Sequence, residues 1–142
     1  MSNDREPHSE WRAFMTALET AEHEFAQGRP AAFKALWSHG DEVSLCGGFG
    51  GMESGWNNVA ARLDWASSRI SEGTRTSKQI RSTVGADFAY IVQTERICFR
   101  VPGRTEQSTV DFRVTMVFRR ESEGWRIVHR HADSQMGTKP PQ

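Results

Sequence analysis

Hydrophobic and polar residues follow two different periods along the chain, and the change between them predicts the order of its elements. In the first half, apolar residues recur at spacings of three and four, which predicts helices over about 9–27, just after Pro30, and over 56–70. A short apolar strand over 43–46 precedes the third helix. Beyond it the period becomes two, which predicts long strands. Their expected ranges are 76–84, 88–99, 109–119 and 125–132.

This order specifies an α+β fold. Four successive strands joined by tight turns pair as antiparallel neighbours, and three amphipathic helices cover one face of their sheet. A long twisted sheet curled around helices makes a cone, and an internal pocket is expected where side chains cannot reach across it. We therefore predict a cone-shaped, curled antiparallel sheet wrapped by three helices from the N-terminal half. A single domain is expected over 9–134, with loose tails over 1–8 and 135–142.

Composition and charge narrow the classes of function. The 142 residues include 18 Lys plus Arg and 18 Asp plus Glu, so nucleic acid and anionic membranes are not expected as partners. The arginines between residues 119 and 130 are interpreted as a solvated sheet face. The N-terminus lacks the apolar core of a signal peptide, and no run is long enough for a membrane span. With Cys46 and Cys98 read as free thiols, a reducing cytoplasm is the expected compartment.

The last predicted strand carries the clearest candidate chemistry. At period two, Trp125, Ile127, His129, His131 and Asp133 share one face, which begins apolar and ends in two imidazoles and a carboxylate. We interpret it as a strand that runs through the core and emerges into a polar cavity.

Three roles for the histidines stay open. A half-buried imidazole titrates near neutrality, so His129 or His131 is a candidate acid/base catalyst, with Asp111 on the neighbouring strand as its orienting carboxylate. The pair also resembles a two-histidine platform for iron, zinc or manganese, but this spacing alone is a weak signal, and neither a metal nor a cofactor is assigned. In the third role, one histidine is a hydrogen-bonded cavity residue and the other lies at a dimer contact.

The strand over 109–119 alternates as well. Its apolar even-numbered residues are expected in the core, and Asp111, Arg113 and Thr115 are expected to face solvent or a partner subunit. A bulge would change which side chains enter the pocket, and Asp111 and Arg113 can pair with each other or across strands. Arg113 and Thr115 are candidate ligand-binding residues.

Three aromatic residues complete the ligand-binding candidates. The glycine-rich run around Phe49 lacks the spacing of a phosphate-binding loop, and we interpret it as a flexible rim or lid. Trp65 lies off the apolar stripe of its helix and either lines the pocket or contacts another helix or subunit. Tyr90 begins a strand, with its hydroxyl toward the cavity or solvent.

The order of elements and the closing run from Trp125 to His131 resemble the nuclear transport factor 2-like superfamily, and within it the SnoaL-like and ketosteroid isomerase-like proteins. The chain also resembles the association domain of calcium/calmodulin-dependent protein kinase II. The segments that carry this second resemblance are 89–91, Thr94, 118–120, 124–125 and 129–131. The resemblance implies a cystatin-like α+β roll with a pocket and a homodimer packed through the sheet. It does not fix function, because this fold hosts isomerases, cyclases, dehydratases, hydrolases and oligomerisation modules.

At some positions the sequence departs from the patterns of these families, which narrows the functions to be expected. The carboxylate base that follows the first strand in ketosteroid isomerases corresponds to Cys46 or Gly47, so steroid isomerisation by that base is not expected. The arginine positions of the association domain correspond to Val92 and Thr115, with Arg113 two residues away.

We therefore expect a SnoaL-like protein that binds a small, partly apolar molecule in the cone pocket and forms a homodimer. One alternative is an enzyme of the isomerase, cyclase or dehydratase type that uses a pocket histidine as acid/base. The other is an oligomerisation module like the kinase association domain.

Overall fold

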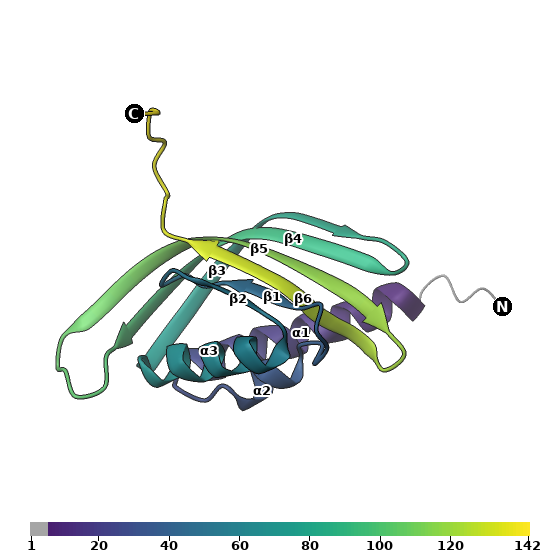
Figure 1. The fold of residues 1–142 in the computed structure, drawn as a ribbon, viewed down its shortest axis with the longest axis horizontal. Helices are drawn as coiled ribbons and strands as arrows, with labels where there is room; N and C mark the ends of the chain where they lie inside the picture. The colour runs from purple at the N-terminus through teal and green to yellow at the C-terminus, as the bar shows by residue number, and fades with distance from the viewer. Residues whose placement is uncertain (1–5) are drawn as a thin grey trace.

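The computed structural model describes residues 6–142, in which three helices cover one face of a six-stranded, curled sheet (Figure 1). The helices are α1 (Glu6–Ala26), α2 (Ala31–Ala35) and α3 (Trp56–Ser68). The strands are β1 (Ser44–Cys46), β2 (Met52–Ser54), β3 (Ser71–Val84), β4 (Phe88–Arg100), β5 (Gln107–Glu121) and β6 (Gly124–Asp133).

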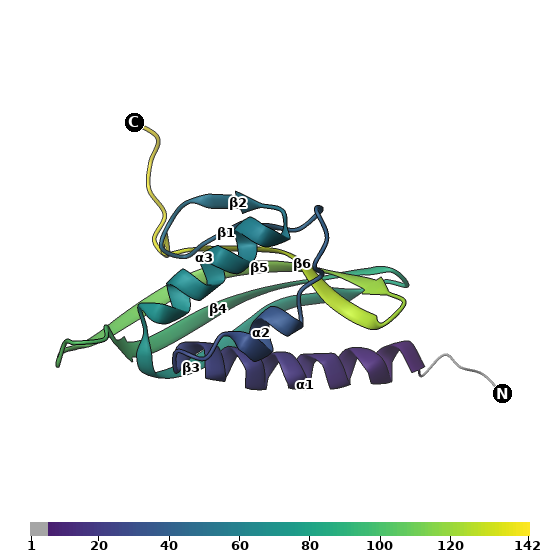
Figure 2. The ribbon, with the colours of Figure 1, turned by 60° about the horizontal axis from the view of Figure 1, so that its bottom comes forward.

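The strand order across the sheet is β2-β1-β6-β5-β4-β3. Strands β3 to β6 pair as antiparallel neighbours, β1 runs parallel to β6, and β2 pairs antiparallel with β1. Figure 2 shows the helices on one side of the sheet, with α1 along β3 and α3 beside β1 and β2. The predicted α+β cone is confirmed. Strand β2 was not predicted, because its three residues follow a glycine run and show no alternation of their own.

Helix α1 forms because its apolar residues lie on one stripe that the sheet buries. Trp11, Phe14 and Leu18 are all at most 8% exposed. The rings of Trp11 and Phe14 meet Phe118 of β5 edge to face, at centroid distances of 5.1 and 5.5 Å, and Trp11 meets Trp125 at 5.2 Å. The even-numbered residues of β5 from 112 to 118 are buried, as predicted. Aromatic burial on this scale makes the contact between α1 and β5 a main part of the core.

Several predicted boundaries shift. Helix α1 begins at Glu6 rather than Ser9, so it covers part of the segment predicted as an N-terminal tail; residues 1–5 of that tail lie outside the described residues. Strand β3 begins at Ser71, five residues before its predicted start, and Gly73 lies inside it. Cys46 and Cys98 are free, as expected. No helix within residues 6–142 combines the length and the apolar content needed to cross a lipid bilayer.

A β-bulge interrupts the pairing of β5 with β6. Val117 pairs with His129, whereas the next residue, Phe118, pairs with Ile127, so Val128 is an extra residue on β6. Ile127 and Val128 are both buried, although they are adjacent in a strand. Residues on either side of such a bulge no longer follow a single alternation.

The bulge corrects the predicted face of β6. Beyond it, Arg130 and Ala132 lie on the concave face of the sheet, whereas His129, His131 and Asp133 point to the outer face, away from the helices. The prediction that these three share the face of the core residues of β6 was wrong, because the extra residue reverses the alternation.

Candidate functional site

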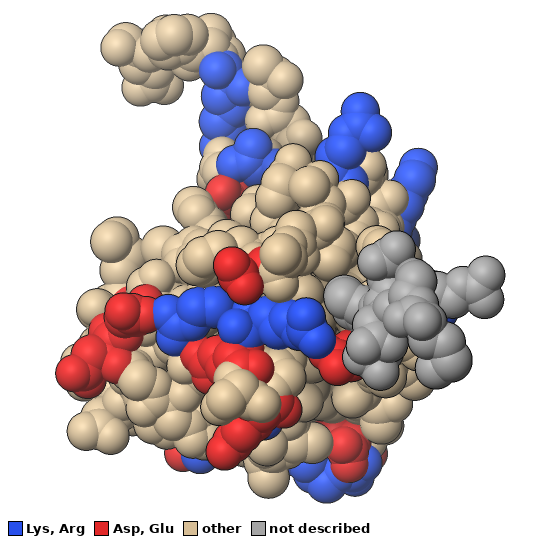
Figure 3. Space-filling view, turned by 90° about the vertical axis from the view of Figure 1, so that its right-hand side faces the viewer, with Lys and Arg blue, Asp and Glu red and all other residues tan. Residues whose placement is uncertain are grey.

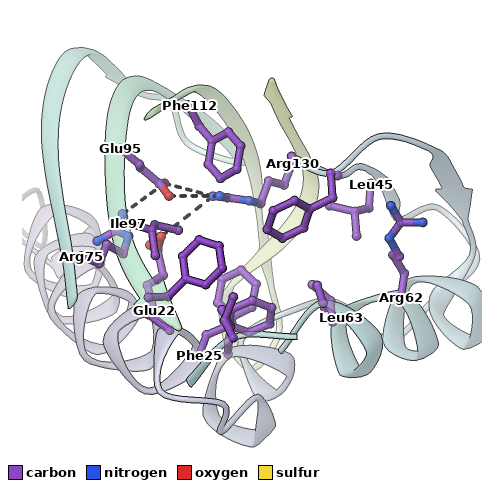
Figure 4. A pocket seen from close by; sticks show the side chains of 18 residues that line it. Glu22, Phe25, Leu45, Arg62, Leu63, Arg75, Glu95, Ile97, Phe112 and Arg130 are labelled. Carbon is purple, nitrogen blue, oxygen red and sulfur yellow. Dashed lines mark hydrogen bonds and ion pairs between the residues drawn. The ribbon is translucent and has the colours of Figure 1, made fainter. Parts of the chain in front are cut away.

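A cavity of about 80 Å³ lies between the concave face of the sheet and helices α1 and α3. Most of its wall is apolar, and every described helix and every strand except β2 contributes to it (Figure 4). Side chains that form this wall include Phe25, Leu45, Leu63, Ile97 and Phe112. A mostly apolar cavity with a few convergent polar groups is the usual form of a small-molecule site.

Four charged side chains form the end of the cavity opposite Arg62 (Figure 4). Glu95 of β4 accepts hydrogen bonds from both terminal nitrogens of Arg130, each at 3.1 Å, and forms an ion pair with Arg75 of β3 at 3.1 Å. Arg75 also lies 2.7 Å from Glu22 of α1. Glu22, Arg75 and Glu95 are 6%, 5% and 2% exposed, so the network is almost shielded from water.

The surroundings of the two carboxyl groups in this network shift their pKa values in opposite directions. Burial by itself raises the pKa of Glu95, but the charges and hydrogen bonds of Arg130 and Arg75 outweigh it and hold that pKa well below its ordinary value. Burial, and then the charge of Glu95, raise the pKa of Glu22 to about 8. At neutral pH, Glu95 is therefore ionised and Glu22 mostly carries a proton. Among the buried groups, two guanidinium groups with one carboxylate leave one positive charge, and the half-exposed Glu19 lies beside Arg75 on the solvent side.

Arg75 retains unused hydrogen-bonding capacity. Its Nη1 forms an ion pair with Glu19 at 3.2 Å, and its Nη2 contacts Glu22 and Glu95. Its buried Nε has no hydrogen-bond partner within residues 6–142. An unpaired buried donor is costly, so the hydrogen bonding of this network is not complete.

The glycine-rich loop covers the opposite end of the cavity. Phe49 is 47% exposed, and its ring meets Phe112 edge to face at a centroid distance of 6.0 Å. Arg62 of α3 donates to the carbonyl oxygen of Gly50, and its guanidinium lies 4.7 Å from the ring centroid of Trp65. The rim is therefore an aromatic flap held to α3 by one arginine.

The ligand-binding residues expected from sequence lie in different places. Phe49 lines the cavity, and Trp65 packs against Phe49 at the rim, with a centroid distance of 6.4 Å. Tyr90, Arg113 and Thr115 lie on the outer face of the sheet, where Arg113 donates to Asp133 at 2.7 and 2.8 Å. The structure does not bring the five candidates together.

The predicted catalytic residues also lie on the outer face. His129 Nδ1 is 2.8 Å from Ser44 Oγ, and burial together with the charge of His131 lowers the pKa of His129. Asp111 accepts from Arg96 at 2.8 and 3.1 Å, so it does not orient a histidine. No histidine of the described chain lines the cavity. The described residues also hold no group of three His, Cys, Asp or Glu side chains arranged for a metal ion.

The charged end of the cavity was missed, although the sequence carries two signals of it. Glu22 lies on the apolar stripe of α1, four residues after Leu18 and three before Phe25. Glu95 lies on the apolar face of β4, between Ile91 and Ile97 in the odd-numbered series. Charged residues at positions that the pattern assigns to the core point to a buried partner or a site.

Three of the four arginines interpreted as a solvated face, Arg119, Arg120 and Arg126, are paired at the surface near the turn between β5 and β6. The fourth, Arg130, is largely buried in the cavity wall, so the interpretation was wrong for that residue. Arg119 pairs with Glu42 and Glu121, and Arg120 pairs with Glu10. Figure 3 shows a row of basic side chains with acidic side chains beside it.

Comparisons with known proteins agree with this architecture. A family model described as a SnoaL-like domain matches residues 12–136. None of the curated proteins compared with the chain matches it. Among solved structures, a ketosteroid isomerase-like protein from Erwinia carotovora atroseptica is 14% identical, with a TM-score of 0.74 over 96% of this chain and 100% of that one.

Two further structures extend the comparison. A nuclear transport factor 2-like superfamily protein from Salmonella enterica is 18% identical, with a TM-score of 0.75 over 95% of this chain and 99% of that one. A chain from Thiobacillus denitrificans, provisionally assigned as a calcium/calmodulin-dependent protein kinase type II association domain, is 22% identical. Its TM-score is 0.70 over 87% of this chain and 93% of that one. At these identities the similarity shows the fold, and the resemblance expected from sequence is confirmed.

Proposed function

The chain belongs to the SnoaL-like family, and we propose that it binds a small molecule with an apolar body and one anionic group, such as a carboxylate. The observation that carries this proposal is the buried pair Arg75 and Arg130 at the end of an apolar cavity. Among the buried groups, only one carboxylate, Glu95, offsets their two charges near neutral pH, and the half-exposed Glu19 pairs with Arg75 from the solvent side.

The physical argument has two parts. Apolar walls favour an apolar ligand by roughly 25 cal/mol per Å² removed from water. The net positive charge of the buried groups at the far end favours an anion. Guanidinium groups bind carboxylates with strong, directional hydrogen bonds, and more so away from water.

The alternative enzyme, which uses a pocket histidine as acid/base, gains no support from the cavity. The titratable side chains in its wall are those of Glu22, Glu95 and arginines. The two histidines lie on the other side of the sheet. Anion binding is the function that the cavity itself favours.

The test compares hexanoate with its uncharged analogue hexanamide at pH 7 by isothermal titration calorimetry. We expect hexanoate to bind and hexanamide to bind at least about tenfold more weakly, a difference of about 1.4 kcal/mol. Arg130→Lys keeps the charge but loses the two-pronged donor, so hexanoate affinity should fall by a similar factor. Circular dichroism of the variant checks that it is folded.

Arg113→Gln is the matched control. Arg113 is also a strand arginine paired with a carboxylate, but it lies on the outer face. We expect this variant to bind hexanoate as the wild type does. Equal affinity for hexanoate and hexanamide, or loss of binding in Arg113→Gln but not in Arg130→Lys, would contradict the proposal.

We also propose that the outer face of the sheet forms the homodimer expected from sequence. Phe88 and Tyr90 are 56% and 41% exposed there, beside half-buried Val92 and Val117. Exposed apolar surface of this kind favours self-association. Tyr90→Arg should therefore convert a dimer into a monomer in sedimentation velocity, whereas Ala86→Arg in the β3–β4 turn should not. A monomeric wild type would refute the proposal.

A further inference from the structure

We propose that binding of an anionic ligand in the cavity is coupled to protonation of Glu22, so that the site favours weak acids and releases them in alkaline solution. This inference rests on the proposed function. It adds a proton to the binding reaction: the ligand enters as an anion, and Glu22 must be neutral in the complex.

The surroundings of Glu22 make it the carboxyl group that responds. Three charged groups from the sheet face it: Arg75 of β3 at 2.7 Å, Arg130 of β6 at 3.9 Å, and the carboxylate of Glu95 on β4. Its own helix adds Glu19, one turn earlier, which shares Arg75. Glu22 therefore has one close and one more distant positive neighbour, and two negative neighbours, in a nearly dry site.

The other two carboxyl groups are poor candidates for this role. Glu95 accepts from both terminal nitrogens of Arg130 and from Gln93 at 2.8 Å, and it also pairs with Arg75, so its negative charge is well supported. The Glu19 side chain is 53% exposed, so it lies at the solvent side of the network rather than in the cavity wall.

Charge balance then links the proton to the ligand. With Glu22 protonated, the buried charges of Arg75 and Arg130 outweigh that of Glu95 by one, and a bound anion balances the buried charges. With Glu22 ionised, the buried charges already balance, and a bound anion adds an uncompensated buried charge, which is strongly unfavourable. The free protein changes between these two states near pH 8, where Glu22 titrates.

Linkage fixes the direction of the effect. Below pH 8 the proton is already in place, so hexanoate binding takes up little or none. Above pH 8 Glu22 is ionised in the free protein, and binding must take up close to one proton. The affinity should therefore fall roughly tenfold between pH 7 and pH 9. Hexanoate itself stays ionised throughout this range, because an aliphatic carboxyl group titrates well below it.

The experiment measures hexanoate binding by calorimetry at pH 7 and pH 9, each in two buffers of different ionisation enthalpy. The difference in observed heat between buffers gives the number of protons taken up. We expect about zero at pH 7 and close to one at pH 9, with a roughly tenfold weaker affinity at pH 9. Glu22→Gln is neutral at every pH, so its proton uptake should vanish and its affinity should not change between the two values.

Glu19→Gln is the matched control, because it removes a neighbouring carboxylate that contacts the same arginine. It should keep the proton uptake and the pH dependence of the wild type. Proton uptake that persists in Glu22→Gln, or that disappears in Glu19→Gln, overturns the assignment to Glu22.

The wild-type result separates this inference from the proposed function. Hexanoate binding with the same affinity at both pH values, and without proton uptake at pH 9, overturns the coupling and leaves anion binding intact. Absence of hexanoate binding at pH 7 overturns both. Neither conclusion depends on whether a variant folds.

Discussion

Replacing Glu95 with glutamine is expected to lower the free energy of unfolding by about 3–5 kcal/mol at pH 7, the usual cost of breaking a buried ion pair from one side. Glu95 is 2% exposed and lies between Arg75 and Arg130, which it contacts at 3.1 Å. Glutamine keeps the shape but removes the charge, so two buried guanidinium groups would lose the carboxylate that both of them contact. Urea denaturation followed by circular dichroism measures the change.

Asp111→Asn is the control for this loss. Asp111 accepts two hydrogen bonds from Arg96, at 2.8 and 3.1 Å, which are similar in length to those between Glu95 and Arg130. Unlike that pair, Asp111 and Arg96 are both substantially exposed. Exposed pairs contribute at most about 1 kcal/mol, so the loss should be small. Equal losses in the two variants would mean that the network at the end of the cavity is open to water.

The loss of unfolding free energy caused by Glu95→Gln should also depend on pH. Because Arg130 and Arg75 lower the pKa of Glu95 in the folded protein, its contribution to stability is complete above the ordinary carboxyl pKa of 4.5. As the pH falls below that value, the unfolded chain takes up a proton that the folded chain does not, and the contribution is lost progressively. Denaturation curves at pH 7 and pH 3.5 should show a smaller difference between wild type and variant at the lower pH.

How far the sequence predicts the structure depends on how regular each element is. The stripe of α1 and the alternation of β5 follow one period from end to end, and both were predicted with the correct buried faces. In β6, Ile127 and Val128 are both apolar and both buried, so no period reveals which of them is the extra residue. Because of this one ambiguity, the two histidines were predicted to enter the cavity, whereas in the structure Arg130 enters it.

Strand β3 presents a different difficulty. Most of its residues are exposed because it is an edge strand, so Arg75 lies among polar residues with no pattern to distinguish it. Arg75 is buried because helix α1, from a distant part of the chain, packs against β3. Glu22 and Glu95, by contrast, interrupt apolar faces. Two of the four charged residues at the site were therefore accessible from sequence, and Arg75 and Arg130 depend on tertiary structure.

The closest backbone contact in this packing leads to the second large prediction, for Gly73→Ala. An added Cβ at Gly73 would lie 2.1 Å from the carbonyl oxygen of Ala26 and 2.8 Å from its carbonyl carbon. Because both groups belong to the backbone, neither can rotate away, and α1 and β3 would have to separate. We expect the free energy of unfolding to fall by about 3 kcal/mol, at the upper end of what overpacking costs.

The same change should weaken ligand binding, because Gly73 lies two residues before Arg75, and Ala26 lies one helical turn after Glu22. Separating the two backbones would pull these side chains apart at the end of the cavity. Gly137→Ala is the control, since an added Cβ there meets nothing within 4 Å, and its stability should stay within about 0.5 kcal/mol of the wild type. If urea denaturation gave Gly73→Ala the stability of Gly137→Ala, α1 and β3 could not lie this close, and the contact of Arg75 with Glu22 would lose its structural basis.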